Sequence, residues 1–284
     1  MEIRVADDGG DEMTLLSYNG HKYSFWPEAL QSNPLERLPS VEIRPDDIII
    51  CAFPKSGTHW VWEMVRLLMA GQLDRDEVSK GSNMMEFASE EEYKDLPSPR
   101  ILNTHLLFSQ LPEQVKVKKP KILYLTRNPK DMTVSFYNFV MKLPMYYKYT
   151  GEWNNFVRPS LEGKFDYGSW FDYVKDWEEV KKTTDVPILT LNYEDMKEDV
   201  FREMKKMQDF LGVNRSDEFV KEVCDHCSFT SMKKVKADMA NIVYRKGEVG
   251  DWKNWFTVAQ NEWFDQIYKE KMKDCPLEFR YTSK

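Results

Sequence analysis

The sequence has few cysteines and no long apolar run, and these absences exclude several classes of protein. Its four cysteines follow no framework spacing, and only Cys224 and Cys227 form a C-x-x-C pair, so we expect reduced thiols rather than disulfides or a zinc site. The longest apolar run, residues 48–53, is far too short to span a membrane. The N-terminal residues are acidic and have no apolar segment, so we expect no secretory signal and a cytoplasmic location.

Positive charge is also in the minority: 40 lysines and arginines face 47 aspartates and glutamates, which gives a net charge of −7. This balance argues against a general nucleic-acid coat, although a local basic pocket for one phosphorylated small molecule is compatible with it. The chain shows no internal repeat or low-complexity tract. Aromatic residues make up 14% of the 284 positions, so the chain is able to bury a large core, in one or two domains.

Short apolar runs alternate with helical patterns along the chain. The runs have strand length and are apolar on both faces, and they lie at residues 48–53, 101–102, 122–125 and 188–191. Helical patterns lie at residues 60–69, 131–142 and 196–211 and after Thr257. Asn128 and Thr257 are expected N-caps, and Gly212 is an expected C-terminal cap. This alternation predicts an α/β fold with a central parallel sheet flanked by helices, whose ligands bind beyond the carboxyl ends of the strands.

The loop after the first apolar run has the composition of a phosphate-binding loop. Residues 54–60 read Pro-Lys-Ser-Gly-Thr-His-Trp and lead from the strand into a helix. Small residues, a lysine and a helix N-terminus together present N–H groups, hydroxyls and positive charge to an anion. The spacing differs from the nucleoside-triphosphate motif G-x-x-x-x-G-K-[ST], and an ordinary turn with a surface lysine would look the same. The loop therefore indicates a phosphate site only together with other signals.

Two further segments place cations at the same edge of the expected sheet. Arg127 ends the third apolar run and Ser135 lies on the following helix, where an arginine is placed to bind a phosphate. Arg245 and Lys246 precede Gly247, which combines charge with close backbone approach and suits a second phosphate. Each segment alone would equally fit a surface ion pair or a solvated loop. Together they predict a site with two anion-binding regions.

A histidine stands where the second strand is expected to end. His105 is one of only four histidines, and its ordinary pKa of about 6.5 would let it accept a proton from a bound hydroxyl. A hydrogen-bonded structural histidine is the alternative. No acidic cluster or Cys/His set in the sequence points to a metal. The combined signals predict two anion-binding regions, one candidate base and no metal.

Four sequence blocks resemble the signature blocks of the cytosolic sulfotransferases. The blocks are Pro54-Lys55-Ser56-Gly57-Thr58-x-Trp60, Arg127-Asn128-x-Lys130-Asp131 with Ser135, Ser228-Phe229-x-x-Met232, and Arg245-Lys246-Gly247-x-x-Gly250-Asp251-Trp252-Lys253-Asn254. The resemblance extends from about Tyr18 to the C-terminus. It implies a single sulfotransferase domain over residues 1–284, with residues 1–17 as a mobile acidic segment. It also implies that the cofactor is 3′-phosphoadenosine 5′-phosphosulfate (PAPS), that the product is PAP and that no metal takes part.

The same resemblance implies roles for individual residues. His105 would be the catalytic base, Lys55 would stabilise charge on the leaving group, and Ser135 would assist. The cofactor would be bound by Lys55, Ser56, Gly57, Thr58, His59, Trp60, Arg127, Ser135, Tyr193, Cys227, Ser228, Phe229, Met232, Arg245, Lys246 and Gly247. Asn103 and His105 would meet the substrate. The two anion-binding regions would hold the phosphates at either side of the ribose, with aromatic residues on the adenine.

The implied reaction is in-line transfer of a sulfuryl group to the hydroxyl or amine of a small apolar acceptor, such as a phenol or sterol. Because protonated His105 cannot accept a proton, the rate should fall below about pH 6. Residues 84–87 and 136–149, rich in methionine and aromatics, are candidates to line the acceptor pocket. A homodimer is predicted by a likeness to the family's dimerisation motif at Lys253, Thr257, Val258 and Glu262.

Departures from the family pattern leave other functions open. His59 stands where most members have threonine, Asn103 where many have lysine, and Cys227 where threonine is usual, so a charge or a hydroxyl contact would be lost at each. The stretch between Met232 and Arg245 is shorter than in the family, which predicts a more open acceptor pocket. The chain could instead be a catalytically weak or silent protein that binds PAPS or PAP. A P-loop nucleotide kinase is a further alternative, although the Walker spacing and a magnesium-binding carboxylate are missing from the sequence.

Overall fold

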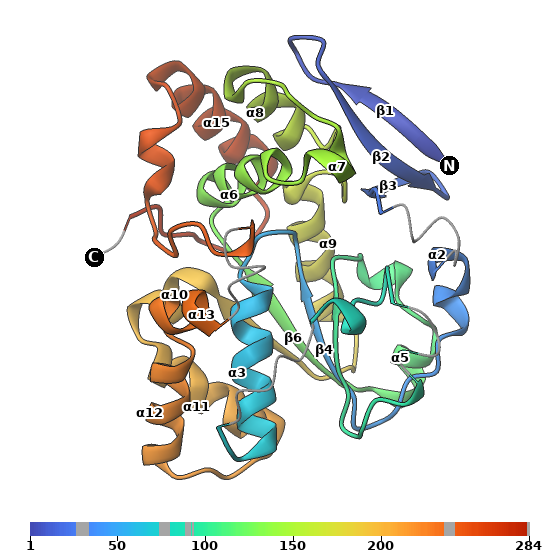
Figure 1. The fold of residues 1–284 in the computed structure, drawn as a ribbon, viewed down its shortest axis with the longest axis vertical. Coiled ribbons are helices and arrows are strands. Elements are labelled where there is room, and N and C mark those ends of the chain that lie inside the picture. The colour runs from blue at the N-terminus through green and yellow to red at the C-terminus, as the bar shows by residue number, and fades with distance from the viewer. Residues whose placement is uncertain (27–33, 74–79, 89–91, 93, 236–241, 283–284) are drawn as a thin grey trace.

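A four-stranded parallel sheet lies at the centre of the computed structural model, which describes residues 1–26, 34–73, 80–88, 92, 94–235 and 242–282 (Figure 1). The strand order is β5-β4-β6-β7. The strands are β4 (Ile48–Ala52), β5 (Ile101–Thr104), β6 (Lys121–Thr126) and β7 (Ile188–Asn192). Each contains one of the apolar runs, so the predicted α/β fold with a parallel sheet is confirmed.

Helices cover both faces of this sheet because its strands are apolar on both sides. Along β4, Ile49 and Cys51 join one buried cluster, whereas Ile48, Ile50 and Ala52 join another. The cluster on the first face takes buried residues from α2 (Pro34–Arg37), α5 (Gln114–Lys118), α6 (Pro129–Met141), α7 (Pro144–Tyr147), α8 (Trp153–Leu161), α9 (Trp170–Thr183) and α15 (Val258–Lys271). The second face is covered by α3 (Thr58–Ala70), α10 (Tyr193–Glu198), α11 (Val200–Leu211), α12 (Asp217–His226) and α13 (Phe229–Val235). Short 3-10 turns complete the chain at η1 (Leu38–Ser40), η2 (Gly81–Asn83), η3 (Phe108–Gln110) and η4 (Asp251–Asn254).

Capping residues set the ends of several helices. Asn128 caps α6 by accepting a hydrogen bond from the Asp131 N–H at 2.8 Å, and Thr257 forms the predicted capping box at α15. Gly212, with a φ of 75°, ends α11 as predicted. The single helix expected over residues 196–211 is wrong. Asp199 leaves the helical region, with a φ of −150°, and its side chain caps a new helix, so α10 and α11 are separate.

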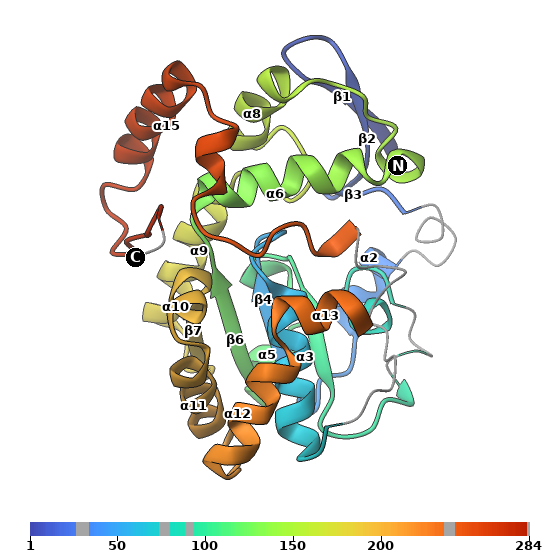
Figure 2. The ribbon, with the colours of Figure 1, turned by 60° about the vertical axis from the view of Figure 1, so that its left-hand side comes forward.

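The N-terminal residues form a sheet of their own, and the expectation of a mobile segment over residues 1–17 is therefore wrong. Strands β1 (Glu2–Ala6), β2 (Glu12–Tyr18) and β3 (His21–Ser24) pair antiparallel in sequence order. Met13 and Leu15 on β2 are fully buried in the main core, which offsets the entropy of ordering this segment. Figures 1 and 2 show this sheet beside α7 and α8.

A buried ion pair fixes the edge of the sheet opposite the strand ends that carry the predicted site. Arg100, which precedes β5, donates two hydrogen bonds to Asp47, which precedes β4, at 2.8 and 2.6 Å. Both side chains are buried. The pair holds β4 and β5 in register, with Ile48 opposite Ile101, so it also fixes how the loops at the other edge meet.

Two earlier expectations concern the pocket opening and membrane spans. Residues 236–241, which belong to the shortened stretch between Met232 and Arg245, lie outside the described residues, so the predicted opening of the pocket stays a prediction. Within the described ranges, no helix is long and apolar enough to cross a membrane.

Candidate active site

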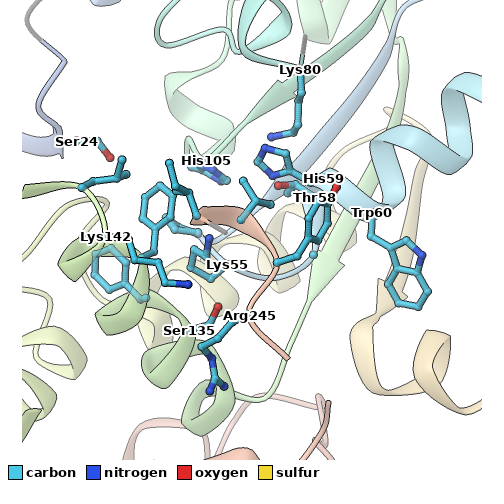
Figure 3. Close-up of a pocket in the computed structure, with 18 of the residues that line it drawn as sticks. Ser24, Lys55, Thr58, His59, Trp60, Lys80, His105, Ser135, Lys142 and Arg245 are labelled. Atoms are coloured by element: carbon cyan, nitrogen blue, oxygen red, sulfur yellow. The ribbon is translucent and has the colours of Figure 1, made fainter. Parts of the chain in front are cut away.

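A cavity of about 1030 Å³ lies at the carboxyl edge of the central sheet. Its wall includes residues of the segments that follow the four strands, namely Pro54, Lys55, His105, Arg127 and Tyr193. Figure 3 shows Trp60 at one side of this cavity and Ser24 at the opposite side, with Lys55 and His105 between them. We call these two sides the Trp60 end and the Ser24 end.

The loop after β4 is shaped for an anion. Lys55 and Gly57 both have left-handed backbone conformations, with φ values of 67° and 105°, and Gly57 is the residue that precedes α3. A side chain at position 57 would strike the ring of Tyr193, since an added Cβ would lie 2.9 Å from Tyr193 Cδ2. The N-terminus of α3, with the positive end of its dipole, therefore stands where the strand enters the cavity.

Arg127 holds this loop from the next strand and adds charge to it. Its Nη1 donates a hydrogen bond to the carbonyl oxygen of Lys55 at 2.9 Å. Its guanidinium also lies 4.2 Å from the centre of the Tyr193 ring, a cation–π contact. Arg127 therefore links β6, β7 and the loop after β4 at one point.

Lys55 is a buried cation of the cavity wall, and its pKa is strongly shifted. Its Nζ lies 3.9 Å from the centre of the Phe139 ring. Burial and, to a smaller extent, neighbouring cations lower the pKa of Lys55 to about 7. Those cations are Arg127, Lys80, Lys142 and Arg245. These cations repel one another across the cavity, and a bound anion would reduce that repulsion.

Arg245 and Lys246 form a second cationic region, and one carboxylate holds both. Arg245 Nη1 and Lys246 Nζ donate to Asp251, the latter at 2.5 Å. Although burial opposes it, hydrogen bonds from these cations and from a neighbouring amide lower the pKa of Asp251 to about 2. Gly247 follows with a φ of 68°, and a Cβ there would clash with the ring of Phe229. Asp251 thus keeps the two cations together beside a closely packed glycine.

Two hydrogen bonds orient His105. Its Nδ1 lies 2.7 Å from the carbonyl oxygen of Ala52, the last residue of β4, and its backbone N–H donates to Glu86 Oε1 at 2.5 Å. A carbonyl oxygen only accepts, so Nδ1 carries the proton and Nε2 is left as the proton acceptor. The ring also packs edge-on against Tyr167, with 5.2 Å between ring centres.

Burial, with the positive charges of Lys80 and Lys55, lowers the pKa of His105 to about 3, and the hydrogen bond to Ala52 opposes this only in part. The ring is therefore neutral across the neutral pH range. The expected loss of activity below about pH 6 used the ordinary pKa of histidine. With its lowered pKa, the His105 ring becomes protonated only well below pH 6.

The structure brings most of the predicted site residues together. The cavity wall contains Lys55, Gly57, Thr58, His59, Trp60, His105, Arg127, Ser135, Tyr193, Cys227, Phe229, Met232, Arg245, Lys246 and Gly247. Of the two stretches expected to line an acceptor pocket, the residues Met84, Phe87, Phe136, Phe139 and 142–147 are also in the wall.

Three predicted residues lie outside the cavity wall. Ser56 is buried beneath the loop. Ser228 is exposed and donates a hydrogen bond to Ser231 at 2.9 Å. Asn103 is fully buried inside β5, where it pairs with Ile50 on one side and bridges to Met84 on the other. The structure therefore does not place Asn103 where a substrate would meet it.

The wall also contains polar residues that the sequence did not single out. These are Ser24, Lys80, Asp166, Tyr167 and Lys197. None belongs to a contiguous motif. Asp166 and Tyr167 lie in the turn between α8 and α9, which does not follow a strand. Lys142, by contrast, lies within the predicted stretch 136–149, seven residues after Ser135 and so on the same side of the helix pattern.

Several buried donors in the site fit a nucleotide with phosphate groups. Within the described parts of the chain, the Ser56 hydroxyl, Arg127 Nε and Arg245 Nε are buried and have no hydrogen-bond partner. All three can donate a hydrogen bond, and unmet buried donors call for a ligand or an ordered water. Their position near the two cationic regions is what a ligand with two separate phosphates requires.

A parallel α/β sheet whose strand ends carry a phosphate-binding loop, two cationic regions and a neutral histidine defines a nucleotide-dependent group-transfer enzyme. The family model described as "Sulfotransferase domain" matches residues 45–276. Sulfotransferase 1A1 of Mus musculus is 40% identical over 270 residues, which cover 87% of this chain and 91% of that protein. Sulfotransferase 1B1 of Canis lupus familiaris is 39% identical, with 88% and 91% covered. The chain belongs to the cytosolic sulfotransferase family.

Solved structures agree with this assignment. The mouse sulfotransferase SULT7A1, crystallised in complex with PAP, matches with a TM-score of 0.78 and 34% identity, covering 92% of this chain and 96% of that one. A retinol dehydratase in complex with androsterone and inactive cofactor PAP matches with a TM-score of 0.76 at 20% identity, which shows the shared fold.

Proposed function

We propose that this protein transfers a sulfuryl group from PAPS to the hydroxyl or amine of a small, largely apolar acceptor such as a phenol or sterol. The observation that carries the proposal is the hydrogen bond between His105 Nδ1 and Ala52, since it leaves Nε2 as a base in the same cavity as the cationic regions. PAPS would supply an activated sulfuryl group, and the chain would supply the base and the binding groups.

The cofactor assignment rests on the match between ligand and wall. We infer that residues 55–60 with Arg127 hold the 5′-phosphosulfate, and that Ser135, Arg245, Lys246 and Gly247 hold the 3′-phosphate. Arg245 and Lys246 would share their charge between Asp251 and the phosphate. Trp60 and Phe229 would contact the adenine, since Trp60 already packs edge-on against Tyr193 with 5.9 Å between ring centres.

The base assignment follows from the protonation state of His105. A neutral imidazole with Nε2 unprotonated accepts the proton of an acceptor hydroxyl, and the lowered pKa keeps it neutral. Lys55 would place its ammonium beside the oxygen that gains charge as the sulfuryl group leaves. We further infer that Ser135 helps to orient the cofactor, because it lines the cavity on α6.

Two wider proposals accompany the reaction. We propose a homodimer through Lys253, Thr257, Val258 and Glu262, supported by the exposure of Val258, an apolar side chain that is 76% exposed at the start of α15. We also propose a cytoplasmic location, supported by the four cysteines, all of which are free thiols.

The reaction is tested with sulfur-labelled PAPS and a panel of phenols, sterols and amines, without added metal. Wild-type protein should give labelled product. His105→Gln should lower kcat by about 10²–10⁴-fold while PAP still binds, because the variant lacks the base and keeps the nucleotide site. His21→Gln, an exposed histidine on β3, is the matched control and should leave kcat unchanged. PAP binding without product from wild-type protein would favour the silent nucleotide-binding alternative.

A further inference from the structure

A buried polar cluster lies in the wall of the cavity at its Ser24 end. The Ser24 hydroxyl donates a hydrogen bond to Asp166 Oδ2 at 2.6 Å, and the Tyr147 hydroxyl donates to the same oxygen at 2.9 Å. The two hydroxyls also lie 3.0 Å apart. All three residues line the cavity and are buried. The cluster joins β3, α7 and the turn before α9, which are far apart in sequence.

The cluster lies on the acceptor side of the predicted base. Figure 3 shows Ser24 on the side of His105 that is away from Trp60, where the cofactor is proposed to bind. Asp166 is followed directly by Tyr167, whose ring packs against the His105 ring at 5.2 Å. An acceptor whose reacting hydroxyl meets His105 therefore extends toward this cluster.

The hydrogen-bonding capacity of Asp166 is only partly used. Among the described residues, Oδ1 of Asp166 is buried and has no hydrogen-bond partner, whereas Oδ2 takes both hydroxyl donors. The buried Tyr167 hydroxyl also lacks a hydrogen bond of normal geometry within the described chain. Burial raises the pKa of Asp166 to about 6, and the two hydroxyl donors counter that rise. A buried carboxylate oxygen without a donor is costly, so its retention calls for a ligand that supplies one.

A purely structural role does not account for the unused oxygen. The turn that carries Asp166 is already tied to β3 through the backbone, because the Tyr167 N–H donates to the Lys22 carbonyl at 2.8 Å. Lys22 Nζ donates to the Lys164 carbonyl at 2.7 Å and closes the same contact. These bonds hold the turn in place without any need for a carboxylate.

The residues around the cluster are mostly aromatic or positively charged, so the cluster differs from them in its chemistry. Trp26 packs against Phe87 and Tyr146 in the same cavity wall, with 5.4 and 4.3 Å between ring centres. Among the described lining residues Asp166 is the only carboxylate, and the other charged ones are cations. An apolar acceptor would satisfy the rings and leave Asp166 Oδ1 unmet, whereas an acceptor with a suitably placed donor would satisfy both.

We propose that Asp166 recognises a hydrogen-bond donor, either a hydroxyl or a protonated amine, that the acceptor carries in addition to the group that receives the sulfuryl. Ser24 and Tyr147 are positioning residues in this arrangement, because they occupy Oδ2 and leave Oδ1 as the acceptor atom. The inference rests on the proposed sulfuryl transfer and names the acceptors that it favours.

Three phenols of equal length test this recognition, because they differ only in the terminal group of the para chain. They are 4-propylphenol, 4-(2-hydroxyethyl)phenol and 4-(2-aminoethyl)phenol. With labelled PAPS, wild-type kcat/KM should be higher for at least one of the two donor-bearing phenols than for 4-propylphenol by about tenfold or more, the effect of one hydrogen bond to a charged group. The two donor-bearing phenols separate a hydroxyl from an ammonium as the recognised group.

The variant Asp166→Ala should bring that ratio close to one, because the contact that distinguishes the donor-bearing phenols from 4-propylphenol is lost. Asp172→Ala, an exposed carboxylate on α9, is the matched control and should leave the ratio unchanged. Calorimetric PAP binding shows whether each variant is folded. If Asp166→Ala fails to fold, wild-type protein supplies the test, since any preference for the amine should grow as pH rises through about 6 and Asp166 ionises.

The outcomes separate the two proposals. An unchanged ratio in folded Asp166→Ala, or no preference for either donor-bearing phenol in wild-type protein, would refute the recognition while turnover of 4-propylphenol upholds sulfuryl transfer. No labelled product from any of the three phenols, nor from the wider panel, would refute sulfuryl transfer and the recognition with it.

Discussion

The lowered pKa of Lys55 predicts that nucleotide binding takes up a proton. With a pKa of about 7, roughly three quarters of the Lys55 side chains are neutral in the free protein at pH 7.5, whereas an ordinary lysine is fully charged. Bound phosphates would favour the charged ammonium and offset the burial that lowers this pKa. Binding of PAP at pH 7.5 should therefore take up about 0.8 of a proton at Lys55, and at pH 6.0 only about 0.1.

Isothermal titration calorimetry measures this uptake from the apparent enthalpy in buffers of different ionisation enthalpy. The variant Lys55→Arg is the control, because a guanidinium stays charged at both pH values and the phosphates of PAP contribute equally to both proteins. The difference in uptake between wild type and Lys55→Arg should be about 0.8 at pH 7.5. Since the free protein binds fewer protons than the complex, raising the pH weakens binding.

The same linkage sets the affinity. Between about pH 7.5 and 9, the PAP affinity of wild-type protein should fall by up to about tenfold per pH unit, and that of Lys55→Arg should stay level. Equal proton uptake by the two proteins, or a wild-type affinity that does not change over this range, would refute the reasoning.

Two further substitutions test the second cationic region and the sheet edge. Gly247→Ala should weaken PAP binding at least about tenfold by calorimetry, because its Cβ would clash with Phe229 and its φ of 68° disfavours alanine; native affinity would contradict this. Asp47→Asn should lower the free energy of unfolding by about 3–5 kcal/mol in a urea titration, because Arg100 is left buried without its charged partner. A loss under about 1 kcal/mol would show that Arg100 finds other partners.

The central sheet and the cofactor half of the site were predictable because each depends on contiguous sequence. Strand β4 is apolar on both faces, and the loop that follows it contains its lysine, glycine and helix start within a few residues. The N-terminal sheet was not predictable in this way. Strand β1 alternates between exposed and partly buried residues, and β2 is buried only because the rest of the chain folds against it.

The acceptor half of the site was largely beyond sequence reasoning. Ser24, Tyr147 and Asp166 lie more than a hundred residues apart at the extremes and meet only after folding. The pKa of His105 had the same limit, because it depends on burial and on Lys80, which reaches the cavity from a distant segment. The sequence placed a histidine at the end of the second central strand, and the tertiary structure determines the pH range in which its ring is neutral.

The carbonyl of Ala52 has a consequence for how acceptor choice can change within this fold. It orients His105, and it belongs to the last residue of the strand before the loop of residues 54–60, so the histidine and that loop share one rigid support. Ser24, Tyr147 and Asp166 come from other elements, namely β3, α7 and the turn before α9. Substitutions at these three positions would therefore reshape the Ser24 end of the cavity while the strand that supports His105 and the loop stays the same.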